Sequence, residues 1–197
     1  MAAGSRTLQV RLLLSAVDRD LEHNTKLVVP RREDEATAHV VLRVLAYCLF
    51  YRAGHPHGGL HLAPGPADRD GPDLLARDLA NRPVEWIICG DPAIDDLRHV
   101  LQHQRGAKVR ILLGSSQERE RLLGGLRTYR RTLGGLGTID VQEVDESLIA
   151  ALARRQEERQ RWMVTVVDGH LYVDVDGQSM DGEVFPVTLP SEEALAR

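Results

Sequence analysis

The chain has 197 residues, of which 43% are hydrophobic and 27% are charged, and its formal net charge at pH 7 is −4. These values are typical of a soluble globular protein, and the length suits one large domain better than two. The negative charge argues against a broad, nonspecific nucleic-acid surface, which needs an excess of lysine and arginine, but it leaves local basic patches open.

The first apolar stretch, "LQVRLLLSAV", is interrupted by Gln9 and Arg11. It therefore matches neither the core of a signal peptide nor a membrane span, and we expect a cytoplasmic protein with no membrane partner. The two cysteines, Cys48 and Cys89, lie far apart and form no CxxC pair. We expect both to be reduced, buried and hydrophobic in role.

Two strands and a helix are predicted at the start of the chain. Mixed apolar and polar residues favour strands over 7–14 and 26–29, which the intervening turn would pair in antiparallel fashion. Apolar residues at helical spacing then predict a long helix that ends near Gly54, with carboxylates such as Glu35 in its first turn. Residues 54–71 are rich in Gly, Pro and His, which indicates an irregular loop, and a short helix is expected over 73–79.

The second part of the chain alternates strand and helix patterns, which predicts crossover connections and a partly parallel central sheet. Strands are expected at 84–90, 108–114 and 138–144, and helices at 92–104, 116–131 and 146–161. Residues 162–177 predict a hairpin with a type I′ turn at Asp168-Gly169. The residues from Pro190 onward are expected to fray.

Five blocks, in this order, resemble the YaeQ family of uncharacterised bacterial proteins: "TLQVRLLLSAVDRDLEH", "EDEATAHVVLRVLAYCLFY", "DGPDLL", "VEWIICGDP" and "VTVVDGHLYV". The resemblance extends from about Thr7 to Pro190. It implies a single YaeQ-like domain over 1–197, with its core at about 7–190. The implied fold is α/β and PD-(D/E)XK nuclease-like, with a mixed central sheet flanked by helices and antiparallel strands near both ends of the chain.

In a nuclease-like site, carboxylates on neighbouring elements hold Mg²⁺, and a lysine helps to position the attacking water. The resemblance assigns the acids of such a site to Glu35, Asp70 and Asp73. The family pattern W-I-E-x-G-x-P, aligned on "WIICGDP", puts Ile88 at the position of the strand glutamate. Glu85 is expected to point to the opposite face of that strand, because successive side chains alternate.

The lysine-bearing helix of the family also matches imperfectly, since Arg98 and His99 stand where lysines are common. An arginine can bind phosphate but is a poor proton relay. We therefore expect a catalytically degenerate binding or accessory protein, with no certain cofactor and with nucleic acid or another protein as its possible partner. The alternative is a divergent Mg²⁺- or Mn²⁺-dependent nuclease or phosphodiesterase that uses Glu35, Asp70 and Asp73.

Three other groups of residues suggest binding sites. Asp95, His99 and His103 recur every four residues, so they could bind a transition metal from one helix face, although a solvated polar face explains the same spacing. Three histidines of the Gly-rich loop offer a weaker zinc pattern: His55, His57 and His61.

The remaining group consists of arginines. Arg98 and the cluster in "RTYRR" could bind phosphate, although solvated helix faces have the same composition. The cluster comprises Arg127, Arg130 and Arg131. Arg43, on the long helix, matches an arginine of the YaeQ pattern, and we expect it to pair with a buried carboxylate.

Overall fold

The computed structural model describes residues 7–31, 34–54, 59–63, 71–104, 106–129, 138–155 and 157–190. Several residues with a predicted role lie outside these ranges: His55, His57, Asp70, Arg130 and Arg131. The predicted fraying from Pro190 onward falls mostly outside them as well.

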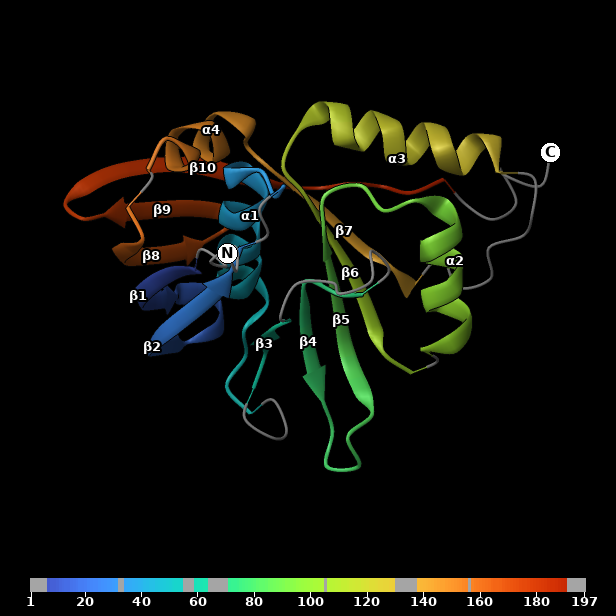
Figure 1. Ribbon diagram of the computed structural model, residues 1–197, viewed down its shortest axis with the longest axis horizontal. Coiled ribbons are helices and arrows are strands. Elements are labelled where there is room, and N and C mark those ends of the chain that lie inside the picture. The colour runs from blue at the N-terminus through green and yellow to red at the C-terminus, as the bar shows by residue number, and fades with distance from the viewer. Residues whose placement is uncertain are drawn as a thin grey trace, which may run out of the picture.

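Ten strands form one mixed sheet in the order β2-β1-β8-β9-β10-β7-β6-β5-β4-β3, and helices lie against it (Figure 1). The strands are β1 (Thr7–Ala16), β2 (Leu21–Pro30), β3 (His61–Leu62), β4 (Leu74–Arg77), β5 (Pro83–Cys89), β6 (Lys108–Leu113), β7 (Asp140–Val144), β8 (Arg159–Val167), β9 (His170–Val175) and β10 (Gln178–Pro186). The helices are α1 (Thr37–Phe50), α2 (Ile94–His103), α3 (Ser116–Thr128) and α4 (Glu146–Ala153), with a 3-10 turn at Val17–Arg19.

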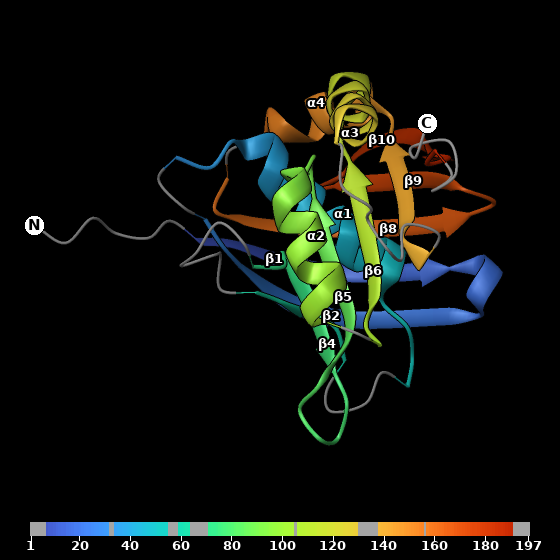
Figure 2. The ribbon, with the colours of Figure 1, turned by 90° about the vertical axis from the view of Figure 1, so that its right-hand side faces the viewer.

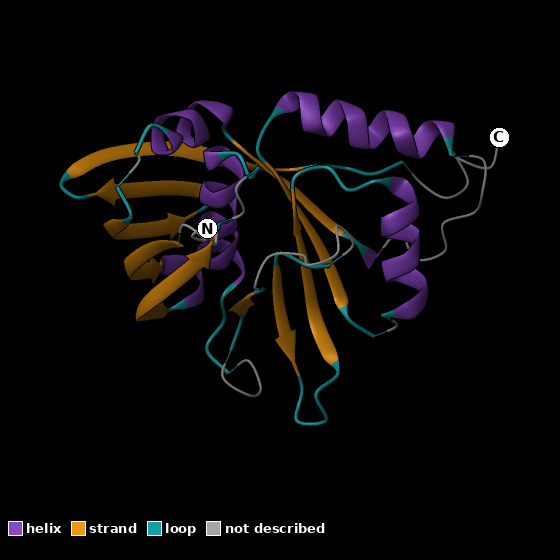
Figure 3. Cartoon of the chain, viewed as in Figure 1, coloured by secondary structure: helices purple, strands orange, loops and turns teal. Residues whose placement is uncertain are grey.

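The sheet has two halves that share β10. We call β2, β1, β8 and β9 the first half and β7, β6, β5, β4 and β3 the second half. Residues 178–183 of β10 pair with β9, and residues 184–186 pair with β7. In Figure 3 the strands of the two halves run in clearly different directions. β10 is therefore the strand through which the two halves form one sheet.

Parallel pairing occurs in both halves. In the second half, β5 pairs with β6 and β6 with β7 in parallel, which confirms the predicted crossovers. In the first half, β1 pairs in parallel with β8, so strands about 150 residues apart in sequence are direct neighbours. The predicted antiparallel pair of N-terminal strands is confirmed as β1 and β2, each longer than expected.

The second half of the sheet is covered on both faces, as Figure 2 shows for α2 in front of the strands. One large core lies between α1, α4, the inner face of the first half and one face of β4 to β7. A second, smaller core lies on the opposite face of β5 to β7, beneath α2 and α3. Because strand side chains alternate, each of β5 and β6 contributes to both cores: Ile87 and Leu112 to the first, and Ile88 and Ile111 to the second.

One element type and two helix boundaries differ from the sequence predictions. The short helix expected over 73–79 is instead β4, because its apolar residues pair with β5. α1 begins at Thr37, so Glu35 precedes the helix rather than lying in its first turn. The helix expected over 146–161 ends at Ala153, and β8 begins at Arg159, where pairing with β1 and β9 overrides local helical spacing.

Two tight hairpins complete the first half. Asp168 and Gly169 have φ angles of 49° and 74°, which confirms the predicted type I′ turn between β8 and β9. Asp176 and Gly177, at 51° and 85°, form a second such turn that leads into β10, a strand the sequence analysis did not predict. Both cysteines are buried and free, as expected. None of the described helices is long and apolar enough to cross a membrane.

Candidate functional site

A cleft of about 260 Å³ opens where the chain leaves β5 and turns into α2. Its wall combines the start of α1, the segment before β4, the end of β5 and the first turns of α2. Four polar side chains line this cleft: His39, Asp73, Asp91 and Asp96. The apolar residue Ile88, on β5, also lines it. Carboxyl ends of parallel strands are common ligand sites in α/β proteins, because loops and helix N-termini gather there.

Asp73 occupies the centre of a buried polar cluster. Its Oδ1 accepts a hydrogen bond from His39 Nε2 at 3.0 Å and lies 3.5 Å from Arg43 Nε. Its Oδ2 accepts the backbone N–H of Cys89 at 2.8 Å, which ties the segment before β4 to the end of β5. Glu35 joins the cluster through Arg43 Nη1 at 3.4 Å and His39 Nε2 at 3.7 Å. Two predicted site acids, Glu35 and Asp73, are therefore brought together.

Arg43 is the buried cation of this cluster, with 1% of its side chain exposed. Besides the two carboxylates, it donates hydrogen bonds to the carbonyl oxygens of Pro30 at 2.8 Å and Ala63 at 2.7 Å. The predicted pairing of Arg43 with a buried carboxylate is confirmed. A buried arginine that satisfies two carboxylates and two carbonyls holds four chain segments in fixed positions.

His39 faces the cleft, and its side chain is 34% exposed. Burial lowers the pKa of His39, but the hydrogen bond to Asp73 and the negative charges of Asp73 and Glu35 outweigh it. The pKa of His39 therefore lies above its ordinary value. An imidazole with a raised pKa next to a carboxylate can hold a proton near neutral pH.

Glu118 approaches the cleft from the other side, at the start of α3. Its Oε2 accepts the backbone N–H of Gly114 at 2.7 Å, and Ser115 caps the helix by accepting from the Glu118 N–H. Gly90, with a φ of 81°, lies between the two groups. A Cβ at this glycine would be 3.6 Å from Glu118 Oε1 and 3.9 Å from His39 Nδ1.

Burial raises the pKa of Glu118, and the nearby negative charge of Asp91 raises it further. The hydrogen bond from the Gly114 N–H lowers the pKa but does not outweigh these two effects, so the pKa of Glu118 lies above its ordinary value. Both carboxylate oxygens of Asp91 accept hydrogen bonds from Arg121, one from Nε at 2.8 Å and one from Nη2 at 2.9 Å. Sequence reasoning missed His39 and Glu118. The Ser-x-x-Glu spacing from Ser115 to Glu118 signalled a helix cap, and nothing in it indicated a cleft.

A family model described as YaeQ protein matches residues 1–184 of the chain. The chain belongs to the YaeQ family. Crystal structures of two YaeQ proteins, from Xanthomonas axonopodis pv. citri and Pseudomonas syringae, share its fold, with TM-scores of 0.79 and 0.77. Each is 22% identical to it, and each alignment covers 95% of this chain and 100% or 98%, respectively, of the other. The comparison with curated proteins finds no match.

The position of the YaeQ strand glutamate is taken here by Ile88, which lines the same cleft as Asp73. Ile88 is half-buried and packs against the second core, so it is only partly an interior residue. Glu85 lies on the opposite face of β5, as predicted, where Arg110 Nη2 is 3.5 Å from its Oε1. The register shift between β4 and β5 precedes Glu85, so it does not turn this side chain toward the cleft.

The acids of the cleft do not form a compact set of metal ligands in this YaeQ chain. Within the described ranges, no group of three or more His, Cys, Asp or Glu side chains could hold a metal ion. The third predicted acid of the site, Asp70, lies outside those ranges.

The alternative metal residues on α2 have other partners. The rings of His99 and His103 stack with centroids 4.1 Å apart, and His103 Nδ1 is bonded to the His99 carbonyl at 2.9 Å. The carboxylate of Asp95 accepts a hydrogen bond from Tyr129 at 2.9 Å. The three residues therefore share a helix face without converging on one point.

The predicted phosphate-binding arginines lie on two helices. Arg98, on α2, is half-buried, lies 3.9 Å from Asp95, and its Nε has no hydrogen-bond partner in the described structure. Arg127 is exposed in the last turn of α3. The other two arginines of this prediction lie outside the described ranges.

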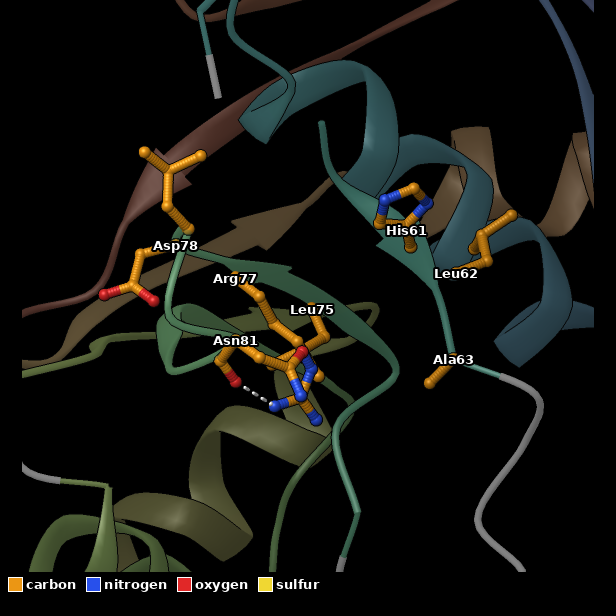
Figure 4. Close-up of a pocket in the computed structure, with 8 residues that line it drawn as sticks. His61, Leu62, Ala63, Leu75, Arg77, Asp78 and Asn81 are labelled. Atoms are coloured by element: carbon orange, nitrogen blue, oxygen red, sulfur yellow. Dashed lines mark hydrogen bonds between the residues drawn. The ribbon is translucent and has the colours of Figure 1, made fainter. Parts of the chain in front are cut away.

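A larger hollow, of about 570 Å³, lies along β3 and β4 (Figure 4). It contains His61, from the loop histidines, and the apolar side chains of Leu62 and Leu75. Arg77 donates a hydrogen bond to the Asn81 carbonyl at 2.8 Å, which closes the β4–β5 turn. Neither Glu35 nor Asp73, the two described acids of the predicted catalytic set, lines this hollow, so we place the candidate site in the smaller cleft.

Proposed function

We propose that this YaeQ protein is a catalytically degenerate relative of the PD-(D/E)XK nucleases that acts as a binding or accessory protein in the cytoplasm. The observation that carries this proposal is the isoleucine at position 88, which lines the same cleft as Asp73. Mg²⁺ binds oxygen ligands at about 2.1 Å in near-octahedral geometry. An isoleucine supplies none of them.

The partners of the remaining acids support the same proposal. Both oxygens of Asp73 are engaged, one by His39 and Arg43 and the other by the Cys89 N–H. Glu35 contacts the same arginine and histidine. A metal ion would have to displace these contacts and leave Arg43 buried without compensating charge, which is unfavourable.

The charge of the cleft gives a third argument. Its described polar lining is mainly acidic, with Asp73, Asp91 and Asp96, and Glu118 lies beside it. Without divalent cations, carboxylates repel a phosphodiester. Unless divalent cations are bound there, this cleft is therefore unsuited to nucleic-acid hydrolysis.

Restoring the missing carboxylate tests the proposal. The wild-type chain should bind no Mn²⁺ in the millimolar range by calorimetry, and should cleave neither single- nor double-stranded DNA or RNA with Mg²⁺ or Mn²⁺. Ile88→Glu should acquire Mn²⁺ binding, whereas Ile88→Gln, which has nearly the same size but no charge, should not. Wild-type cleavage, or equal Mn²⁺ binding by both variants, would contradict the proposal.

The second candidate is a divergent Mg²⁺- or Mn²⁺-dependent nuclease or phosphodiesterase that uses Glu35, Asp70 and Asp73. The observation in its favour is that Glu35 and Asp73 both contact His39 and Arg43 at one side of the cleft. This candidate predicts cleavage that Asp73→Ala abolishes and that Asp181→Ala, in the part of β10 that pairs with β9, leaves intact.

A further inference from the structure

One face of the first half of the sheet has no helix over it within the described residues (Figures 1 and 3). The inner face packs against α1 and α4 in the first core. The outer face is built from alternate residues of β2, β1, β8 and β9, which are exposed or half-buried along each strand. We call this surface the open face.

Four cations gather at one end of the open face. In the strand register Arg11 lies directly opposite Lys26 on one side and Arg161 on the other. Arg159 precedes Arg161 by two residues, so it lies on the same face. All four side chains are exposed, and none has an ion pair or hydrogen bond within the described structure. The carboxylate of Asp176, next to them, accepts the backbone N–H of Arg161.

This arrangement has a cost for the isolated chain. Opposite residues on neighbouring strands have Cβ atoms about 5 Å apart, and like charges at that distance are destabilising. A lysine on an edge strand such as β2 commonly guards against edge-to-edge aggregation. The arginines lie on β1 and β8, which have a strand on each side, so edge protection does not account for them.

Apolar side chains continue the open face beyond the cations. Leu13 and Met163 lie directly opposite each other and are 45% and 39% exposed, and Tyr172, one strand further along, is 50% exposed. These three residues line a shallow hollow of about 480 Å³. The open face therefore joins a cluster of unpaired cations to a concave, partly apolar floor.

Two acids, Asp174 and Asp181, line this hollow, and both are already engaged. Asp181 is bonded to His170 at 2.9 Å, and Asp174 accepts hydrogen bonds from Ser179 and the Gly177 N–H. Glu22, on β2, is exposed on the open face and has no partner within the described structure. Four cations against this one acid leave the unpartnered charge of the described face mainly positive, which favours an anionic partner and disfavours pairing with the same face of a second copy. The concavity disfavours a flat lipid surface, which would reach the rim before the floor.

We propose that the open face binds single-stranded nucleic acid. The phosphates would contact Arg11, Arg159, Arg161 and Lys26, and the bases would lie against Leu13, Met163 and Tyr172. Arginine and lysine attract the phosphate backbone without reading its sequence, and an exposed aromatic ring can stack on any base. This surface is formed by other strands than the cleft, so the inference holds whether or not the cleft is catalytic.

Fluorescence anisotropy with labelled oligothymidylate and oligouridylate tests this inference in EDTA, which excludes metal-dependent binding at the cleft. Wild type should bind at least one of the two probes. The logarithm of its affinity should fall with that of the salt concentration with a slope of roughly −3 for four phosphate contacts. Arg11→Gln/Arg161→Gln should weaken binding at least about tenfold and reduce that slope by about half.

The matched control is Arg82→Gln/Arg154→Gln, which removes two exposed arginines outside the open face. It should bind like wild type. Failure of wild type to bind either probe overturns the inference, and so does an equal loss in both double variants. Binding to phosphatidylserine vesicles with no binding to the oligonucleotides also overturns it, as does a wild-type dimer that Arg11→Gln/Arg161→Gln dissociates in light-scattering measurements. Folding of each variant is checked by circular dichroism.

Discussion

At the scale of single residues, the cleft is organised by Arg43 and the groups it holds. A buried guanidinium cannot lose its proton, so it requires permanent negative partners, which Glu35 and Asp73 supply. His39 is more exposed than the other members of the group, and its raised pKa lets it hold a proton near neutral pH. The cluster thus joins a buried arginine to a histidine whose charge affects stability.

We predict a pH-dependent contribution of His39 to stability. Its pKa is raised in the folded chain, so the stabilisation is fully present below the unfolded pKa of about 6.5 and is lost as the pH rises through the folded pKa. In urea unfolding, the difference between wild type and His39→Gln should therefore be largest near pH 6 and shrink toward pH 9. In an Asp73→Asn background the trend should weaken. A difference that grows with pH would contradict the assignment.

At the scale of elements, two adjacent glycines of α3 differ in how closely they approach α2. A Cβ added at Gly124 would have no atom within 4 Å, whereas one added at Gly125 would lie 2.9 Å from Cγ1 of Ile94 on α2. Gly125 is therefore the point of close approach between these two helices, and Gly124 carries only the conformational cost of glycine in a helix.

The two glycines provide a matched pair of variants. Gly124→Ala should raise the free energy of unfolding by roughly 0.5 to 1 kcal/mol, because alanine loses less conformational freedom in a helix. Gly125→Ala should lower it by about 1 kcal/mol, because Ile94 must move to accommodate the new methyl group. Chemical denaturation measures both. Equal effects at the two positions would show that the α2–α3 contact is looser than described.

The sequence predicted some elements well because their signals are local. Side-chain alternation gave the correct direction for Glu85, and Asp168-Gly169 gave the correct turn. β4 was mistaken for a helix because four strand residues carry too little periodicity to distinguish the two. β10 was missed because its sequence has few β-branched residues, and its identity depends on pairing with β9 and β7.

The candidate site was predictable only in part for the same reason. Glu35 and Asp73 could be assigned through the family resemblance, and the structure brings them together. His39 and Glu118 are 79 residues apart, and they meet near Gly90 only because α1 and α3 both begin at the carboxyl ends of the central strands. No local pattern encodes that meeting, since it results from the packing of two helices on opposite faces of one sheet.

At the scale of the whole molecule, the two halves are expected to unfold together. They share β10, and the first core contains residues from both, such as Val164 and Ile87. The two tryptophans report on different halves, since Trp162 is fully buried in the first and Trp86 is half-buried in the second.

We predict that Trp86→Phe and Trp162→Phe, each followed through its remaining tryptophan, unfold in urea at the midpoint that circular dichroism gives for the same variant. Coincident transitions are the mark of a single cooperative unit. If the fluorescence of Trp86 changed at lower urea than the ellipticity, the second half would be an independent folding unit, and the shared strand would not couple the two.

The parallel pairing of β1 with β8 also has a consequence during synthesis. β1 can join β2 as soon as both have left the ribosome, but its other edge fits Arg159 to Val166, which is made more than 120 residues after β2 ends. At translation rates of about 5 to 20 residues per second, an apolar hairpin would wait on the order of ten seconds with one edge unfilled. We therefore expect the N-terminal hairpin of the nascent chain to be prone to aggregation until the last strands emerge and complete the sheet.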